Sequence, residues 1–82
     1  MIRREIDMTV TQPHCIVMEI LRENQQYYLT KEEIYERVPY IDNEKSITIS
    51  QLETTLRQMR NCRQIDVLYI KHRTYYALVL ER

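Results

Sequence analysis

Apolar residues recur at intervals of three and four positions in three parts of the chain, and this spacing is typical of helices that bury one face. The first part predicts a helix over about residues 12–24, with Thr11 as its N-cap and Pro13 in its opening turn. The side chains expected to face the core are Ile16, Val17, Ile20 and Leu21.

The second helical pattern begins at a capping box, in which Thr30 and Glu33 have the spacing needed to satisfy each other's free backbone donors. The helix is expected over about residues 31–38. Its buried stripe consists of Ile34, Tyr35 and Val38. Pro39 cannot extend a helix, so residues 39–47 are expected to form a loop.

The third helical pattern is expected to open at another capping box, formed by Ser50 and Glu53, and to end near Cys62 or Arg63. Its apolar side chains follow one another at intervals of four and three residues, so they should lie on one inward face. These residues are Leu52, Leu56 and Met59.

The remaining segments have strand patterns. Residues 5–10 alternate apolar and polar side chains, as a short strand or arm would, and residues 27–29 suit a single extended rung. Residues 65–71 and 74–80 are rich in Val, Ile, Leu and Tyr and predict a β-hairpin. Their connection lacks the Asn-Gly or Asp-Gly of a tight turn, so we expect a longer open loop over residues 71–74.

These elements define an α+β fold with three helices, a short strand after the first helix and a C-terminal hairpin. A chain of 82 residues has room for one domain, assigned to residues 11–82 after an arm at residues 1–10. The order resembles that of the winged-helix superfamily, in which the hairpin is the wing. The segments that carry the resemblance are ILREN (20–24), YLTKEEIYERV (28–38), ITISQLETTLRQM (47–59) and YYALVL (75–80).

Within that superfamily the spacing is most similar to the N-terminal DNA-binding domain of ferric uptake regulator proteins, notably in LTKEEIY at residues 29–35. Those proteins usually have a Tyr-Arg pair where this chain has Glu53 and Thr54. They also continue into a metal-binding dimerisation domain, for which this chain has no counterpart. The resemblance therefore does not imply iron sensing by this chain, and no cofactor is expected.

Composition excludes several classes of enzyme. The chain contains no glycine, and a P-loop, a dinucleotide-binding GxGxxG and a nucleophile elbow all require it. No combination of Ser, His and carboxylate has a suggestive spacing, so we expect no enzymatic activity. The longest apolar run, residues 75–80, is too short for a membrane span, and no signal peptide is recognisable. A cytoplasmic location is expected.

Cysteine and histidine offer weak candidates for chemistry. His14, Cys15, Cys62 and His72 include ligand types that zinc prefers, but their spacing matches no known zinc site. Cys15 and Cys62 are instead expected to be reduced thiols at core or boundary positions, with both histidines in solvent.

Charge is distributed unevenly although the net charge is zero. Residues 1–44 contain five basic and nine acidic side chains, a net of −4, whereas residues 45–80 contain six basic and two acidic ones, a net of +4. Local potential rather than total charge attracts a polyanion, because salt screens charges beyond about 10 Å. The C-terminal half is therefore expected to present a basic face.

The resemblance implies that the third helix enters the major groove of double-stranded DNA and that the wing contacts phosphates. The face of that helix opposite its apolar stripe carries Arg, Gln and Asn, which can pair with base edges. An exposed helix face is usually polar in any case, but between Ser46 and Ile65 only Glu53 is acidic, and the wing tip is also basic. The candidate DNA-binding residues are Thr54, Arg57, Gln58, Arg60, Asn61, Arg63, Lys71, His72 and Arg73.

The sequence also has features that suit two other kinds of partner, single-stranded nucleic acid and protein. Seven tyrosines suggest stacking on single-stranded nucleic acid, but most are expected at core or boundary positions. A winged-helix module that binds a protein is the main alternative, with the arm and the acidic half as its surface. The acidic residues concerned are Glu19, Glu23, Glu32, Glu33 and Glu36. Because one small domain reads only a half-site, we expect a transcriptional regulator that acts as a homodimer joined by residues 1–10 and the first helix.

Overall fold

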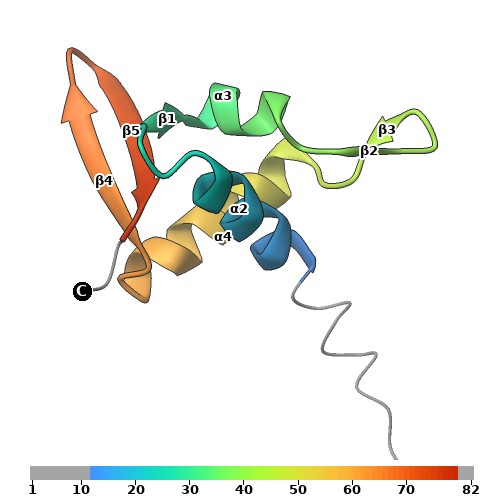
Figure 1. Cartoon of the computed structure of the whole chain (residues 1–82), viewed down its shortest axis with the longest axis horizontal. Helices are drawn as coiled ribbons and strands as arrows, with labels where there is room; N and C mark the ends of the chain where they lie inside the picture. The colour runs from blue at the N-terminus through green and yellow to red at the C-terminus, as the bar shows by residue number, and fades with distance from the viewer. Residues whose placement is uncertain (1–11, 80–82) are drawn as a thin grey trace, which may run out of the picture.

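The computed structural model of the chain describes residues 12–79, and Figure 1 shows three helices flanked by a long and a short hairpin. The expected α+β class is confirmed. The expected strand or arm at residues 5–10 and the N-cap at Thr11 lie outside the described residues. The elements are α2 (Gln12–Glu23), β1 (Leu29–Thr30), α3 (Lys31–Glu36), β2 (Tyr40–Ile41), β3 (Glu44–Lys45), α4 (Ile49–Asn61), β4 (Ile65–Ile70) and β5 (Arg73–Leu78).

The three strands β1, β5 and β4 form one antiparallel sheet in that order. The central strand β5 pairs with β1 through Leu29–Tyr76 and Thr30–Tyr75, and with β4 along the whole hairpin. The hairpin stands at one end of the helices, and α2 lies in front of α4 in Figure 1. The strand predicted at residues 27–29 begins later, because hydrogen bonds from Asn24 to Leu21 and from Tyr27 to Asn24 keep the preceding residues in turns.

The core lies where the three helices meet the inner face of this sheet. All three predicted apolar stripes contribute to it, although Ile16 and Tyr35 are only partly buried. Burial of these side chains is the main favourable contribution to folding. The fully or nearly fully buried residues are Val17, Ile20, Leu21, Leu29, Ile34, Val38, Ile47, Leu52, Leu56, Met59 and Ile65.

Helix α3 begins at the predicted capping box and is shorter than expected. The Thr30 hydroxyl accepts a hydrogen bond from the Glu33 N–H at 3.2 Å, and the Glu33 carboxylate accepts one from the Thr30 N–H at 2.9 Å. The helix ends at Glu36 rather than near residue 38. Pro39 explains the difference, because a proline disfavours helical backbone in the residue before it.

The N-cap of helix α4 lies two residues before the predicted one. Thr48, not Ser50, caps it, and its box partner is Gln51 rather than Glu53. The Thr48 hydroxyl accepts from the Gln51 N–H at 3.1 Å, and the Gln51 side chain accepts from the Thr48 N–H at 2.8 Å. Two overlapping sequences fit the capping pattern, and the earlier one forms.

The segment expected to be a loop, residues 39–47, contains the short hairpin of β2 and β3. Its two-residue turn places Asp42 at φ 54° and Asn43 at φ 71°, the left-handed conformation that both residues tolerate well. The Lys45 ammonium fastens this hairpin to the end of α3. It donates to the carbonyls of Tyr35, Glu36 and Val38 at 2.8, 3.1 and 3.2 Å, and it lies over the rings of Tyr35 and Tyr40.

The long hairpin closes more tightly than the sequence suggested. Ile70 pairs directly with Arg73, so the turn contains only Lys71 and His72, not residues 71–74. Their φ values of 51° and 69° give the type I′ geometry, which suits the twist of the flanking strands. The sheet therefore imposes the tight turn on a Lys-His pair in place of the Asn-Gly or Asp-Gly that usually forms it.

The cysteines are exposed, which corrects the expectation of core or boundary thiols. Cys15 lies on the opposite side of α2 from its buried residues, and Cys62 follows the last residue of α4. Most tyrosines were also expected at core or boundary positions, and this is wrong for four of the seven. These four are Tyr27, Tyr28, Tyr40 and Tyr69.

The C-terminus of α4 ends in a Schellman motif built without glycine. The Gln64 N–H bonds to the Met59 carbonyl at 2.8 Å, and the Arg63 N–H bonds to the Arg60 carbonyl at 3.0 Å. Arg63 occupies the position where glycine is usual, at φ 60°. A side chain in this conformation costs about 1 kcal/mol relative to glycine.

Replacement of Arg63 by glycine should therefore stabilise the fold. We expect Arg63→Gly to raise the free energy of unfolding by about 1 kcal/mol and the Tm by about 4–8 °C, measured by thermal and urea denaturation. The matched control is Gln58→Gly inside α4, where glycine should lower stability by about 1 kcal/mol. Equal effects of the two changes would contradict the argument.

Removal of the Lys45 ammonium should destabilise the fold. Lys45→Met retains the length of the side chain but removes three hydrogen bonds to carbonyls at the end of α3, of which only that of Tyr35 keeps a backbone donor, the Val38 N–H. We therefore expect a loss of about 2 kcal/mol in urea denaturation. Arg37→Met is the control, because Arg37 donates to a single carbonyl, that of Glu33, from an exposed position. Its loss should be below about 1 kcal/mol.

Candidate nucleic-acid interface

The orientation of α4 follows from its buried side. Leu52, Leu56 and Met59 face the core as predicted, and Thr55 joins them, with its hydroxyl donating to the Gln51 carbonyl at 2.7 Å. The other side of the helix is therefore turned outward. The candidate residues on α4 are all exposed, namely Thr54, Arg57, Gln58, Arg60 and Asn61.

A groove of about 440 Å³ separates α4 from the long hairpin. Arg57 and Arg60 line one side of it, Lys31 enters from the start of α3, and the hairpin contributes Thr74 and Tyr76. Three cationic side chains from two helices thus line one hollow. We call it the basic groove; its remaining lining residues are Glu53, Leu56 and Val67.

The acidic residue in the basic groove is paired. The Lys31 ammonium donates to the Glu53 carboxylate at 2.6 Å and joins α3 to α4 across 22 positions of sequence. This hydrogen bond, followed by the charge of Lys31, lowers the pKa of Glu53 below its ordinary value of 4.5. The same bond raises the pKa of Lys31 above 10.5. Although Glu32, Glu33 and Glu36 follow Lys31 closely in the sequence, its ion-pair partner lies on α4.

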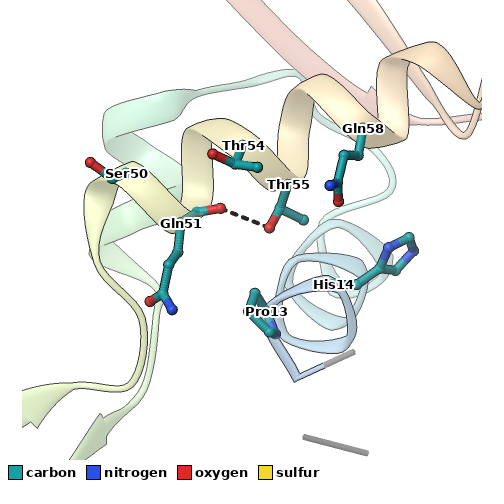
Figure 2. Close-up of a pocket in the computed structure, with 7 residues that line it drawn as sticks. All are labelled: Pro13, His14, Ser50, Gln51, Thr54, Thr55 and Gln58. Carbon is teal, nitrogen blue, oxygen red and sulfur yellow. Dashed lines mark hydrogen bonds between the residues drawn. The ribbon is translucent and has the colours of Figure 1, made fainter. Parts of the chain in front are cut away.

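Thr54 and Gln58 lie on the other side of α4, where they line a cleft of about 310 Å³ against α2. Figure 2 shows Gln58 extending from α4 toward α2, on which Pro13 and His14 complete the cleft. These two candidates are one helical turn apart, so they share a side that the groove arginines do not. The exposed ridge of α4 therefore separates an uncharged polar cleft from the basic groove.

The tip of the long hairpin carries three more candidates, Lys71 and His72 in the turn and Arg73 at the start of β5. All three are exposed. Arg73 lines a third hollow with Thr30, Thr74, Glu32 and Glu33, so acidic side chains share its surroundings. Thr74 lines both this hollow and the basic groove, which makes the two adjacent.

Asn61 and Arg63 lie at the base of the hairpin, where α4 passes into β4. Six residues of strand separate the base from the turn, a length of about 20 Å. The nine candidates therefore do not form one compact cluster. Arg57 and Arg60 come together in the basic groove, and the others lie beside it or at its two ends.

None of the cationic candidates forms an ion pair within residues 12–79, where the pairs are Arg22 with Glu19 and Lys31 with Glu53. Their positive charge is therefore not cancelled by a bonded carboxylate among the described residues. Sequence reasoning missed Lys31 as a member of this site. Its neighbours in sequence are mostly acidic, and no local signal marks a contact between residues 31 and 53.

Comparison with models of protein families, with curated proteins and with solved structures finds no match for this chain. Within the described range, no three His, Cys, Asp or Glu side chains are close enough together to hold a metal ion. None of the helices in that range has the length and apolar character needed to cross a bilayer.

The Lys31–Glu53 pair predicts a pH window of stability. Because the pKa of Glu53 is lowered, its contribution to stability is fully present above pH 4.5 and is lost as the pH falls through the lowered pKa. Because the pKa of Lys31 is raised, its contribution is fully present below pH 10.5 and is lost as the pH rises through the raised pKa. Glu53→Gln should therefore lower the Tm slightly between these limits and leave it unchanged beyond them.

The measurement is the Tm of the wild type and of Glu53→Gln across the pH range, repeated in a Lys31→Met background. In that background the Glu53→Gln change should lose its effect, because the partner is already absent. An effect of the same size in both backgrounds would show that the pair does not stabilise the fold.

Proposed function

We propose that this chain is a small winged-helix protein that binds double-stranded DNA, with α4 in the major groove and the β4–β5 hairpin on the sugar-phosphate backbone. The observation that carries the proposal is the basic groove. Lys31, Arg57 and Arg60 line it, its one carboxylate is bonded to Lys31, and neither arginine has an ion-pair partner among the described residues. A row of phosphates is the ligand that such a groove between a helix and a hairpin attracts.

The order and pairing of the elements support the winged-helix assignment. A helix, a short strand, two further helices and a hairpin follow one another, and the short strand β1 pairs with the last strand, β5. This arrangement keeps α4 beside the hairpin, which is the relation that a recognition helix and a wing require. Sequence-specific DNA binding by such a unit is typical of transcriptional regulators. A regulatory role and a cytoplasmic location are therefore part of the same proposal.

The experiment is a mobility-shift titration on mixed-sequence duplex DNA. We expect Arg57→Glu and Lys71→Glu each to weaken binding at least about tenfold, because a contact of this kind contributes about 1–3 kcal/mol. Arg22→Glu is the matched control. It makes the same change of charge on α2, away from the groove, at an arginine paired with Glu19 at 3.2 Å, and it should bind like the wild type.

Salt dependence adds a second readout. About five phosphate contacts predict that log affinity falls with log salt concentration at a slope between about −4 and −5. Equal weakening by all three charge reversals would mean that only overall charge is being measured. The absence of any shifted complex with wild-type protein at low salt would overturn the proposal.

A protein-binding module is a second candidate, and the short hairpin favours it. Tyr40 and Ile41 are 65% and 54% exposed there, beside the acidic Asp42 and Glu44. Exposed apolar side chains that lie next to one another and are bordered by polar residues are typical of surfaces that bind other proteins. The mobility-shift titration separates the two candidates, because a module of this kind would not retain duplex DNA at any salt concentration.

A further inference from the structure

The outer edge of β4 is the longest unpaired strand edge in the described part of the chain. β5 is the centre of the three-stranded sheet, and β1 at its other side is two residues long and continues directly into α3. β4 has six residues, reads Ile-Asp-Val-Leu-Tyr-Ile, and within residues 12–79 pairs on one side only. It contains no Lys or Pro, two residues with which proteins often protect an open edge, and Asp66 is its one charged residue.

The hydrogen-bond pattern identifies the backbone groups that this edge offers. The Val79 N–H bonds to the Gln64 carbonyl at 3.1 Å, so residue 64 directs its groups toward β5. In an antiparallel pair this direction alternates along the strand, so residues 66, 68 and 70 also face β5. Ile65, Val67 and Tyr69 therefore direct their N–H and C=O groups away from β5, toward the open edge.

We propose that a second copy of this chain pairs with this edge, so that two β4 strands lie antiparallel about a two-fold axis at Val67. Each Val67 would then exchange both backbone hydrogen bonds with Val67 of the other copy, and Ile65 would pair with Tyr69. This register uses all three outward-facing residues of both strands. It joins two three-stranded sheets into one sheet of six.

The side chains of β4 suit this register. The two-fold axis is perpendicular to the sheet, so paired side chains share a face, and Asp66 meets Leu68 rather than the Asp66 of the other copy. The same face carries the exposed apolar side chains Leu68 and Ile70, at 37% and 47% exposure, and the pairing would place the two Leu68 side chains diagonally opposite each other across the seam. The zero net charge of the chain leaves no overall repulsion between copies.

This pairing moves the dimer seam away from the position that sequence reasoning gave it. Residues 1–10 lie outside the described residues, and the exposed surface of α2 is mainly polar. Its exposed residues are Gln12, Cys15, Glu19, Arg22 and Glu23. A two-fold dimer through β4 also closes on itself, so it leaves only the short β1 edges at its ends. The inference does not depend on the proposed DNA binding.

The first test is the mass of the wild-type protein in solution by light scattering. We expect twice the 10.1 kDa of one chain, falling to one chain on dilution. Val67→Pro should remain monomeric and folded, because it removes an N–H that faces the open edge and not one that bonds to β5. A wild-type mass of one chain at every concentration up to about 1 mM would overturn the proposal.

The second test measures the register by disulfide formation in a Cys15→Ser, Cys62→Ser background. Val67→Cys should cross-link under mild oxidation, because directly paired residues have Cα atoms about 5.5 Å apart, within disulfide range. Ile70→Cys is the control, since it is more exposed but would lie about 20 Å from its counterpart.

Cross-linking that is equal in the two variants, or stronger at residue 70, would overturn the proposed register. If Val67→Pro remained a dimer, the proposal that the copies pair through the β4 edge would be wrong. Cross-linking of Val67→Cys without loss of DNA binding would support the dimer and the DNA proposal separately. A dimer that binds no DNA would support the edge pairing and contradict only the proposed function.

Discussion

Two residue pairs between β1 and β5 determine where the long hairpin stands. Leu29 opposite Tyr76 and Thr30 opposite Tyr75 join the C-terminal part of the chain to the start of α3. Thr30 is both the last residue of that strand and the cap of the helix, so the sheet and α3 cannot shift independently. The basic groove exists because this pairing brings Lys31 and the hairpin to the same side of α4.

Much of the fold could be predicted from local patterns. The positions of the three helices and of the hairpin strands follow from apolar spacing, because burial of one face is the strongest constraint on a short chain. The errors fall where two local solutions compete. Thr48 with Gln51 and Ser50 with Glu53 both fit a capping box, and the Glu53 carboxylate is bonded instead to Lys31, a contact that depends on tertiary structure.

The turns could not be predicted because the chain has no glycine. Five of the residues that the structure describes adopt positive φ without it, and at Lys71 and His72 the register of the flanking strands outweighs the local cost. The candidate site could be predicted only in part, because its arrangement also depends on tertiary structure. Helical spacing identifies an exposed side of α4, but it cannot tell that Gln58 faces α2 while Arg57 faces the hairpin. That difference arises from the neighbours on each side.

The short passage from α4 to β4 has a consequence for any ligand that touches both. Only Cys62, Arg63 and Gln64 separate the helix from the strand, and all three donate backbone hydrogen bonds to carbonyls of α4. The two walls of the groove, α4 and the long hairpin, therefore have a fixed relative orientation before a ligand binds. Binding does not have to order a hinge between them. A protein with a flexible hinge at this position would lose part of its binding free energy in ordering the hinge, and a rigid connection avoids that loss.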